Sequence, residues 1–200
     1  MRNEHTDVKQ RILDTGRGII LGKGFSAVGL NEILSTAQVP KGSFYHYFKS
    51  KEAFGEALVD SYVADYVAQV DRLLQDDGAP AAQRLMRYWK SWMSGDGQTA
   101  ECNCLVVKLS AEVSDMSEAM RAALLRGTDL IIERVAGCIA DGLADGSLTA
   151  NLQPRHTALM LYELWLGAAL LSKIRRDRSA LDTAMAATAE LLNLPRQASG

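Results

Sequence analysis

Two of the three cysteines in this chain stand one residue apart, as Cys102-Asn103-Cys104, in a polar stretch of the sequence. A thiol can ligate a metal, pair as a disulfide, act as a catalytic nucleophile or react with electrophiles and oxidants. It can also be a small buried hydrophobe. These five alternatives need different partner residues, so the rest of the sequence helps to separate them.

Three of the alternatives lack partners. A structural zinc site needs about four ligands, and a catalytic cysteine needs a histidine base with an orienting third group. A Cys102–Cys104 disulfide would close a small, strained ring. We therefore expect no metal and no other cofactor, because the remaining candidate residues are scattered along the chain: His5, His46, Cys138 and His156.

The two cysteines of the pair differ in their expected local structure. Asn103 is a good N-cap for a helix that begins with L-V-V-K-L-S-A-E, which would place the Cys104 sulfur at a helix N-terminus with Lys108 one turn further on. Both features lower the pKa of a thiol and favour its thiolate. Cys104 is therefore a candidate sensor of electrophiles and oxidants, whereas the roles of Cys102 and Cys138 stay open.

The composition indicates a soluble helical protein. The 200 residues are 48% hydrophobic and 23% charged, with only four prolines, and no alternating strand pattern is evident. The N-terminus has no apolar signal segment, and the apolar stretch 158–171 is interrupted by Glu163 and falls short of the ~18 residues of a membrane span. With an odd number of cysteines, we expect a cytoplasmic protein with no membrane partner.

Charge is distributed unevenly along the chain. Residues 1–50 carry a net charge of +3 and the remaining 150 residues a net charge of −5. A basic N-terminal part on an acidic body suggests a polyanionic partner for the N-terminal part alone.

Apolar periodicity predicts three short helices followed by five or six longer ones, an all-α architecture. The first helix would be capped by Thr6 or Asp7 and end near Gly22, and Pro40 would open the third. The predicted ranges are about 6–22, 30–36, 40–47, 50–75, 81–93, from 104, 117–143, 154–175 and 179–192.

Residues 30–48 have helix-turn-helix spacing, two helices of about two turns each across a four-residue turn. The apolar positions expected to fill the angle are Ile33, Ala37, Val39, Phe44 and Phe48. The exposed positions of the second helix are then Lys41, Gly42, Ser43, Tyr45 and His46. Hydrogen-bond donors and an aromatic suit a helix that lies against bases and phosphates, although any helical corner could share this spacing.

The segment G-F-S-A-V-G-L-N-E-I-L-S-T-A-Q-V-P-K-G-S-F-Y-H-Y-F-K-S-K-E-A-F resembles the DNA-binding domain of TetR-family repressors. The resemblance covers about residues 8–58 and implies a homodimeric, all-helical repressor that binds double-stranded operator DNA. It implies that Lys41 and Ser43 meet base edges and that Tyr45, His46 and Lys51 hold phosphates. Gly29 would begin the second helix and offer backbone N–H groups, but it lacks the hydroxyl of the Thr that many members carry nearby.

The resemblance also implies two domains, a helix-turn-helix domain over 1–50 and a sensing and dimerisation domain over 51–200. Residues 158–171, A-L-M-L-Y-E-L-W-L-G-A-A-L-L, are apolar nearly all round, which fits either an interface or a core helix. Gly167, Ala168 and Ala169 would allow close approach. In TetR-like proteins the last two helices form the dimer bundle, with Leu181, Met185, Ala189 and Leu192 as the second stripe.

The stretches C-L-V-V-K-L-S-A-E-V-S-D-M-S-E-A-M-R and L-Y-E-L-W-L-G-A-A-L-L-S-K-I further resemble TetR repressors that respond to electrophiles and reactive chlorine. That resemblance makes Cys104 the sensor and implies that Lys173 can join it, once oxidised, in a sulfenamide bond. Lys173 alternatively acts as a cation at a helix C-terminus.

Two further hypotheses remain. The same repressor could be induced by a noncovalent small hydrophobic ligand in a pocket lined by Trp89, Trp92, Tyr162 and Trp165. A thiol enzyme without DNA binding is the third possibility, although we expect no enzyme.

Overall fold

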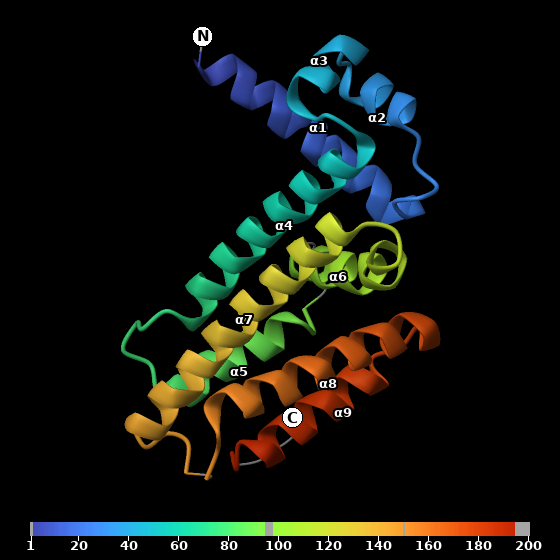
Figure 1. Cartoon of the computed structure of the whole chain (residues 1–200). Helices are drawn as coiled ribbons and strands as arrows, with labels where there is room; N and C mark the ends of the chain where they lie inside the picture. The colour runs from blue at the N-terminus through green and yellow to red at the C-terminus, as the bar shows by residue number, and fades with distance from the viewer. Residues whose placement is uncertain (1, 95–97, 150, 195–200) are drawn as a thin grey trace. The chain divides into compact units, whose positions relative to one another are not determined.

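The computed structural model describes residues 2–94, 98–149 and 151–194, with side chains described for residues 8–94, 106–149 and 151–194. Within these residues there are nine helices and no strand, which confirms the predicted all-α class (Figure 1). The helices are α1 Arg2–Lys23, α2 Leu30–Ala37, α3 Lys41–Tyr47, α4 Lys51–Leu74, α5 Ala81–Ser91, α6 Gln98–Ser114, α7 Glu118–Ala144, α8 Pro154–Arg175 and α9 Ser179–Leu191.

The contacts divide the chain into two compact units, one comprising residues 1–65 and 104–127 and the other residues 66–103 and 128–200. In the first unit α1 packs against α2 and α3 (Figure 1). All five residues expected to fill the helix-turn-helix angle are buried: Ile33, Ala37, Val39, Phe44 and Phe48.

The turn between α2 and α3 has a defined cause. Gln38 adopts a left-handed conformation with φ 54°, and the N–H groups of Gln38 and Val39 return to the carbonyls of Ser35 and Leu34. The Val39 side chain is buried as well, so both backbone hydrogen bonds and apolar packing hold the turn that joins α3 to α2.

The second unit contains a hairpin of α8 and α9, which lie side by side (Figure 1). The buried indole Nε1 of Trp165 donates to the hydroxyl of Thr188 on α9 at 2.9 Å. At the start of α5, the carboxylate of Asp145 and the hydroxyl of Ser147 accept hydrogen bonds from the N–H groups of Ala81 and Ala82. These contacts satisfy groups that would otherwise be orphaned at a helix start.

Two predicted helix starts are wrong. α1 begins at Arg2, before the expected caps Thr6 and Asp7. α6 begins at Gln98, so Asn103 is not an N-cap, and Cys104 lies in the second turn of the helix rather than at its N-terminus. The reason is that residues 98–114 contain no Gly or Pro and begin with good helix formers, so a polar stretch without apolar periodicity still continues the helix.

Of the described residues, α8 forms the one helix long and apolar enough to cross a membrane. A single helix of this kind is weak evidence for a membrane span, because apolar helices of soluble proteins meet the same criteria.

Candidate nucleic-acid interface and sensor region

The orientation of α3 is set by the packing of a buried aromatic side chain on its inner face. Phe44 is fully buried, and its ring contacts those of Phe48 and Phe54 at centroid distances of 5.1 and 5.7 Å. With Phe44 pointing inward, helical spacing turns Tyr45 outward, where it is 52% exposed. The other residues predicted for this face are exposed or, in one case, half-buried: Lys41, Gly42 and His46 exposed, and Ser43 half-buried.

The charge around α3 has one sign. No Asp or Glu occurs from residue 33 to residue 51, whereas Lys41, Lys49 and Lys51 all fall in this stretch. A stretch of chain with donors and cations and without acids is suited to a phosphate backbone.

Gly29 is the N-cap of α2, in an extended conformation with φ −79° and ψ 148°, and no side chain caps the helix. A Cβ added at Gly29 would meet nothing within 4 Å. The start of α2 is therefore an open helix N-terminus with unsatisfied N–H groups and without a side-chain hydroxyl.

Lys51 has a contact that the sequence reasoning did not foresee. Its Nζ donates to the carbonyl oxygen of Phe25 at 2.9 Å and lies 4.7 Å from the centroid of the Phe25 ring. The ammonium has three donors, so this bond ties the start of α4 to the α1–α2 turn without exhausting them.

The same turn is held by α6 through Glu112. Its carboxylate accepts hydrogen bonds from the N–H of Phe25 at 2.9 Å and from the N–H of Ser26 at 2.6 Å. Gly24 reaches this arrangement with φ +90°, and a Cβ there would lie 3.1 Å from the carboxylate. We call the contacts of Glu112 with Phe25 and Ser26 the α6 clamp.

Burial raises the pKa of Glu112, but hydrogen bonds from the Ser26 hydroxyl and from the two backbone N–H groups, together with the Lys51 cation, outweigh it. The pKa of Glu112 is therefore below its ordinary value of 4.5. The carboxylate is charged at neutral pH, and the clamp is built for that charged form.

Lys108 adds a second attachment four residues earlier on α6. Its Nζ donates to the carbonyl oxygens of Leu21 and Gly22, the latter at 3.0 Å, at the C-terminal end of α1. The expectation that Lys108 activates the Cys104 thiol is not supported, because its ammonium is directed to these carbonyls. The sequence reasoning missed the roles of both Lys108 and Glu112, although their i, i+4 spacing in K-L-S-A-E is visible.

The three cysteines fall into two groups. The side chains of Cys102 and Cys104 lie outside the described part of the structure, and only their helical backbone in α6 is defined. Cys138 is 4% exposed, and its sulfur donates to the Ala81 carbonyl oxygen at 3.6 Å. Burial raises the pKa of Cys138 to about 11, so this thiol stays protonated and unreactive at neutral pH. No group of three or more potential metal ligands occurs among the described residues.

The four aromatic residues predicted to line a pocket do come together, in the second unit. The Trp89 and Trp165 rings stack at 5.2 Å with an interplanar angle of 14°, and Trp92 contacts Trp165 and Tyr162 at 5.8 and 6.1 Å. All four are buried against one another as a core. Burial raises the pKa of Tyr162, which indicates that its hydroxyl is neutral. A hollow of about 720 Å³ in this unit lies beside Asp76, Arg84 and Asp145 instead.

The α8–α9 hairpin leaves an apolar surface uncovered in the single chain. Ile174 is 68% exposed, and a Cβ added at Gly167 would meet nothing within 4 Å. Lys173 lies exposed in the last turn of α8, where a cation favours the helix dipole. The exposed apolar side chains of α8 are Leu159, Met160, Leu164, Leu170, Leu171 and Ile174.

The α6 clamp predicts a measurable loss of stability in Glu112→Gln. We expect the free energy of unfolding at pH 7 to fall by about 1 kcal/mol, because a charged acceptor of two N–H groups becomes neutral. A group with a lowered pKa stabilises above its unfolded value and loses that effect as the pH falls through its folded value. The deficit of the variant in urea unfolding should therefore shrink below about pH 4.5.

Glu118→Gln is the matched control, since among the described residues the Glu118 carboxylate pairs with Arg121, on an exposed helix surface. We expect a much smaller change for this variant at pH 7. An equal loss in both variants would contradict a special role for Glu112.

Comparison with known proteins agrees with this geometry. Residues 12–58 match the bacterial regulatory proteins of the tetR family, and residues 78–188 match a tetracyclin repressor-like C-terminal domain. The HTH-type transcriptional repressor NemR of Escherichia coli strain K12 is 40% identical over 196 residues, 96% of this chain and 98% of NemR. The HTH-type transcriptional repressor DhaR of Mycobacterium sp. strain GP1 is 34% identical, over 94% of this chain and 93% of DhaR.

The solved structures give the same result. A crystal structure of E. coli NemR in its reduced form superposes with a TM-score of 0.85, covering 92% of this chain and 96% of that one at 40% identity. Because the relatives are transcriptional regulators, the expectation that the chain is not an enzyme is confirmed. The chain belongs to the TetR family of bacterial transcriptional regulators and is a NemR-like repressor.

Proposed function

We propose that this repressor, as a cytoplasmic homodimer, binds operator DNA through α2 and α3 and releases it when electrophiles or reactive chlorine modify Cys104. One observation carries the proposal: the helix that contains Cys104 also contains Lys108 and Glu112. Lys108 hydrogen-bonds the end of α1, and Glu112 hydrogen-bonds the α1–α2 turn. A chemical change on α6 then acts on the unit that carries the recognition helix.

The proposed DNA contacts follow from the exposed face of α3. Lys41 and Ser43 meet base edges, and Gly42 lets the backbone approach the groove. Tyr45 and His46 hold phosphates, as does Lys51 with the donors not used by the Phe25 carbonyl. The uncapped N–H groups at Gly29 meet a further phosphate.

The proposed dimer uses the α8–α9 hairpin. The exposed apolar side chains of α8 would be covered by the same surface of a second chain, an isologous contact. Gly167 has no neighbour within Cβ reach in the single chain, so it leaves room for a partner helix to come close. Two linked copies would place two recognition helices on successive half-sites.

The proposed sensor chemistry is thiol-based. Cys138 is unsuited because it is buried and protonated, which leaves the pair on α6. Hypochlorous acid converts the Cys104 thiol to a sulfenic acid with release of HCl. The neutral amine of Lys173 would then attack the sulfur, forming an S–N bond and releasing water. Maleimide-type electrophiles would instead alkylate the thiolate.

A second candidate inducer is a noncovalent hydrophobic ligand with an acceptor oxygen. The observation in its favour is the indole Nε1 of Trp89, which is buried and has no hydrogen-bond partner among the described residues. A carbonyl compound entering between the aromatic rings would satisfy that donor, at the cost of separating Trp89 from Trp165. The covalent mechanism requires no such opening.

Gly29 gives a test of the DNA-binding surface. Gly29→Ser adds a helix cap and a hydroxyl donor where the structure has open space, so we expect roughly fivefold tighter operator binding, or about 1 kcal/mol. Gly29→Ala, which adds only the Cβ, should give no gain. Fluorescence anisotropy on a duplex selected in vitro by this protein measures both, and equal affinities of the Ser and Ala variants would contradict the phosphate contact.

The cysteine mechanism is tested by operator gel shifts with and without N-ethylmaleimide or limiting hypochlorite. Wild type and Cys102→Ser should lose affinity by roughly tenfold or more on treatment, and Cys104→Ser should keep it. Release of Cys104→Ser at wild-type doses would refute the assignment of Cys104. An unresponsive wild type that is released by a hydrophobic carbonyl compound would favour the second candidate.

A further inference from the structure

Met116 carries a thioether sulfur, which the proposed Cys104 mechanism does not use. It lies in the turn between α6 and α7, and its side chain is 48% exposed, so solvent can reach its sulfur. Met120, four residues later, is fully buried, and its sulfur lies 2.6 Å from the position that a Cβ added at Gly55 would take. Oxidants in solution can therefore reach one of these two thioethers and not the other.

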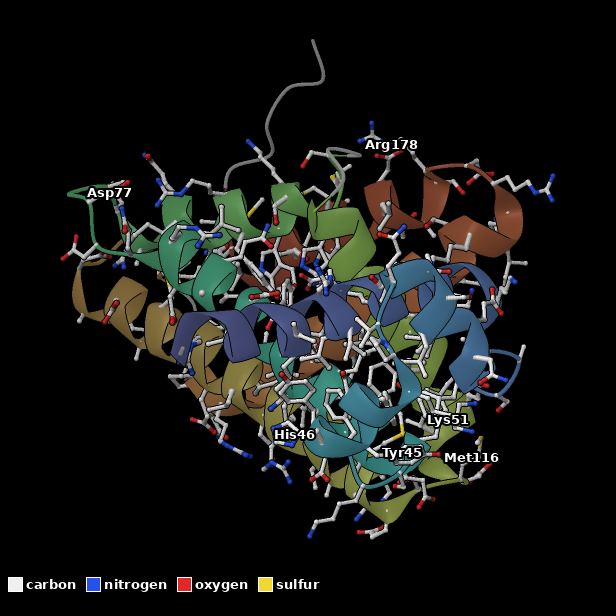
Figure 2. The ribbon with its side chains drawn as sticks, turned by 90° about the horizontal axis from the view of Figure 1, so that it is seen from above. Tyr45, His46, Lys51, Asp77, Met116 and Arg178 are labelled. Carbon is white, nitrogen blue, oxygen red and sulfur yellow. The ribbon has the colours of Figure 1, made fainter. Side chains whose placement is uncertain are left out.

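The Met116 sulfur has a specific partner. The hydroxyl of Ser26 donates to Sδ of Met116 at 3.0 Å, from a residue 90 positions earlier in the chain. The same hydroxyl also hydrogen-bonds the carboxylate of Glu112. A serine hydroxyl has one proton, so these two acceptors share a single donor. Met116 and Lys51 both belong to the first unit and lie on the same side of it (Figure 2).

Oxidation would change the balance between these acceptors. With hypochlorous acid, the thioether sulfur takes up the chlorine and hydroxide leaves; water then displaces chloride from the chlorosulfonium, so an S–O bond forms and HCl is released overall. With a peroxide, the sulfur attacks one oxygen directly, and the other oxygen leaves as water. The product, methionine sulfoxide, is polar, whereas the thioether is a weak hydrogen-bond acceptor. The new oxygen would draw the Ser26 hydroxyl away from Glu112 and occupy space between the α6–α7 turn and the α1–α2 turn.

We propose that Met116 is an oxidation site for two-electron oxidants, and that its sulfoxide weakens operator binding by loosening the α6 clamp at Ser26. Ser26 is three residues from Gly29, the N-cap of α2, so a shift of this turn reaches the start of the helix-turn-helix. The inference rests on the proposed repressor function but does not require Cys104, because thioether oxidation needs no thiolate.

The test uses wild-type protein and Met116→Leu, treated with limiting hypochlorite and then with dithiothreitol. Dithiothreitol reverses sulfenic acids, disulfides and sulfenamides and leaves methionine sulfoxide in place. After both treatments we expect roughly fivefold weaker binding of the selected duplex by wild type and unchanged binding by Met116→Leu. Methionine sulfoxide reductases should restore the wild type.

Two further measurements make the test specific. Peptide mass spectrometry, which needs no DNA, should show Met116 oxidised roughly tenfold faster than Met120. Ser26→Ala should be oxidised at Met116 as fast as wild type but lose less affinity, because the shared donor is gone.

Equal dithiothreitol-resistant loss in Met116→Leu and wild type, or oxidation of Met120 as fast as Met116, would overturn the inference. A failure of the cysteine mechanism appears separately, as a lack of any dithiothreitol-reversible component. N-ethylmaleimide leaves thioethers intact at neutral pH, so it should act on wild type and Met116→Leu alike.

Discussion

The hydrogen bonds that the Glu112 carboxylate accepts from the N–H groups of Phe25 and Ser26 join α6 to the α1–α2 turn. The α1–α2 turn exposes backbone groups that no helix satisfies, and α6 supplies a partner of each polarity. Glu112 accepts from N–H groups, and Lys108 donates to the carbonyls at the end of α1. A helix that carries the candidate sensor cysteine thereby becomes part of the support of the DNA-binding helices.

The α6 clamp also links a chemical change on α6 to the unit that carries α3. The position of α3 depends on the turn after α2 and on the packing of Phe44 against Phe48 and Phe54. Neither is near α6 in sequence, but both belong to the unit that the α6 clamp holds together.

The helix-turn-helix could be predicted from the sequence because its determinants are local. Apolar spacing placed Ile33, Val39 and Phe44 in the angle, and helical geometry then fixed which residues of α3 face outward. The extent of α8 was predicted correctly for a similar reason, since Pro154 at its start and a stretch that is apolar except for Glu163 define it. Such patterns lie within a few turns of one another and need no knowledge of tertiary contacts.

The sensor region could not be predicted in the same way. The expected N-cap at Asn103 failed because the choice between loop and helix in a polar stretch has weak local signals. The contacts of Lys108 and Glu112 join residues 86 or 87 positions apart, so nothing nearby in the sequence indicates them. The aromatic residues Trp89 and Trp165 were expected together and are together, but as a packed core, because their rings fill the space that a pocket would need.

The central claim is that modification of Cys104 is transmitted through α6 to the α1–α2 turn. Hydrogen–deuterium exchange of residues 21–28, measured before and after N-ethylmaleimide treatment, tests it most directly, because the N–H groups of Phe25 and Ser26 are held by Glu112. We expect faster exchange of this segment in modified wild type and no change in Cys104→Ser. Unchanged exchange of the segment in wild type that has released its operator would rule out transmission through α6.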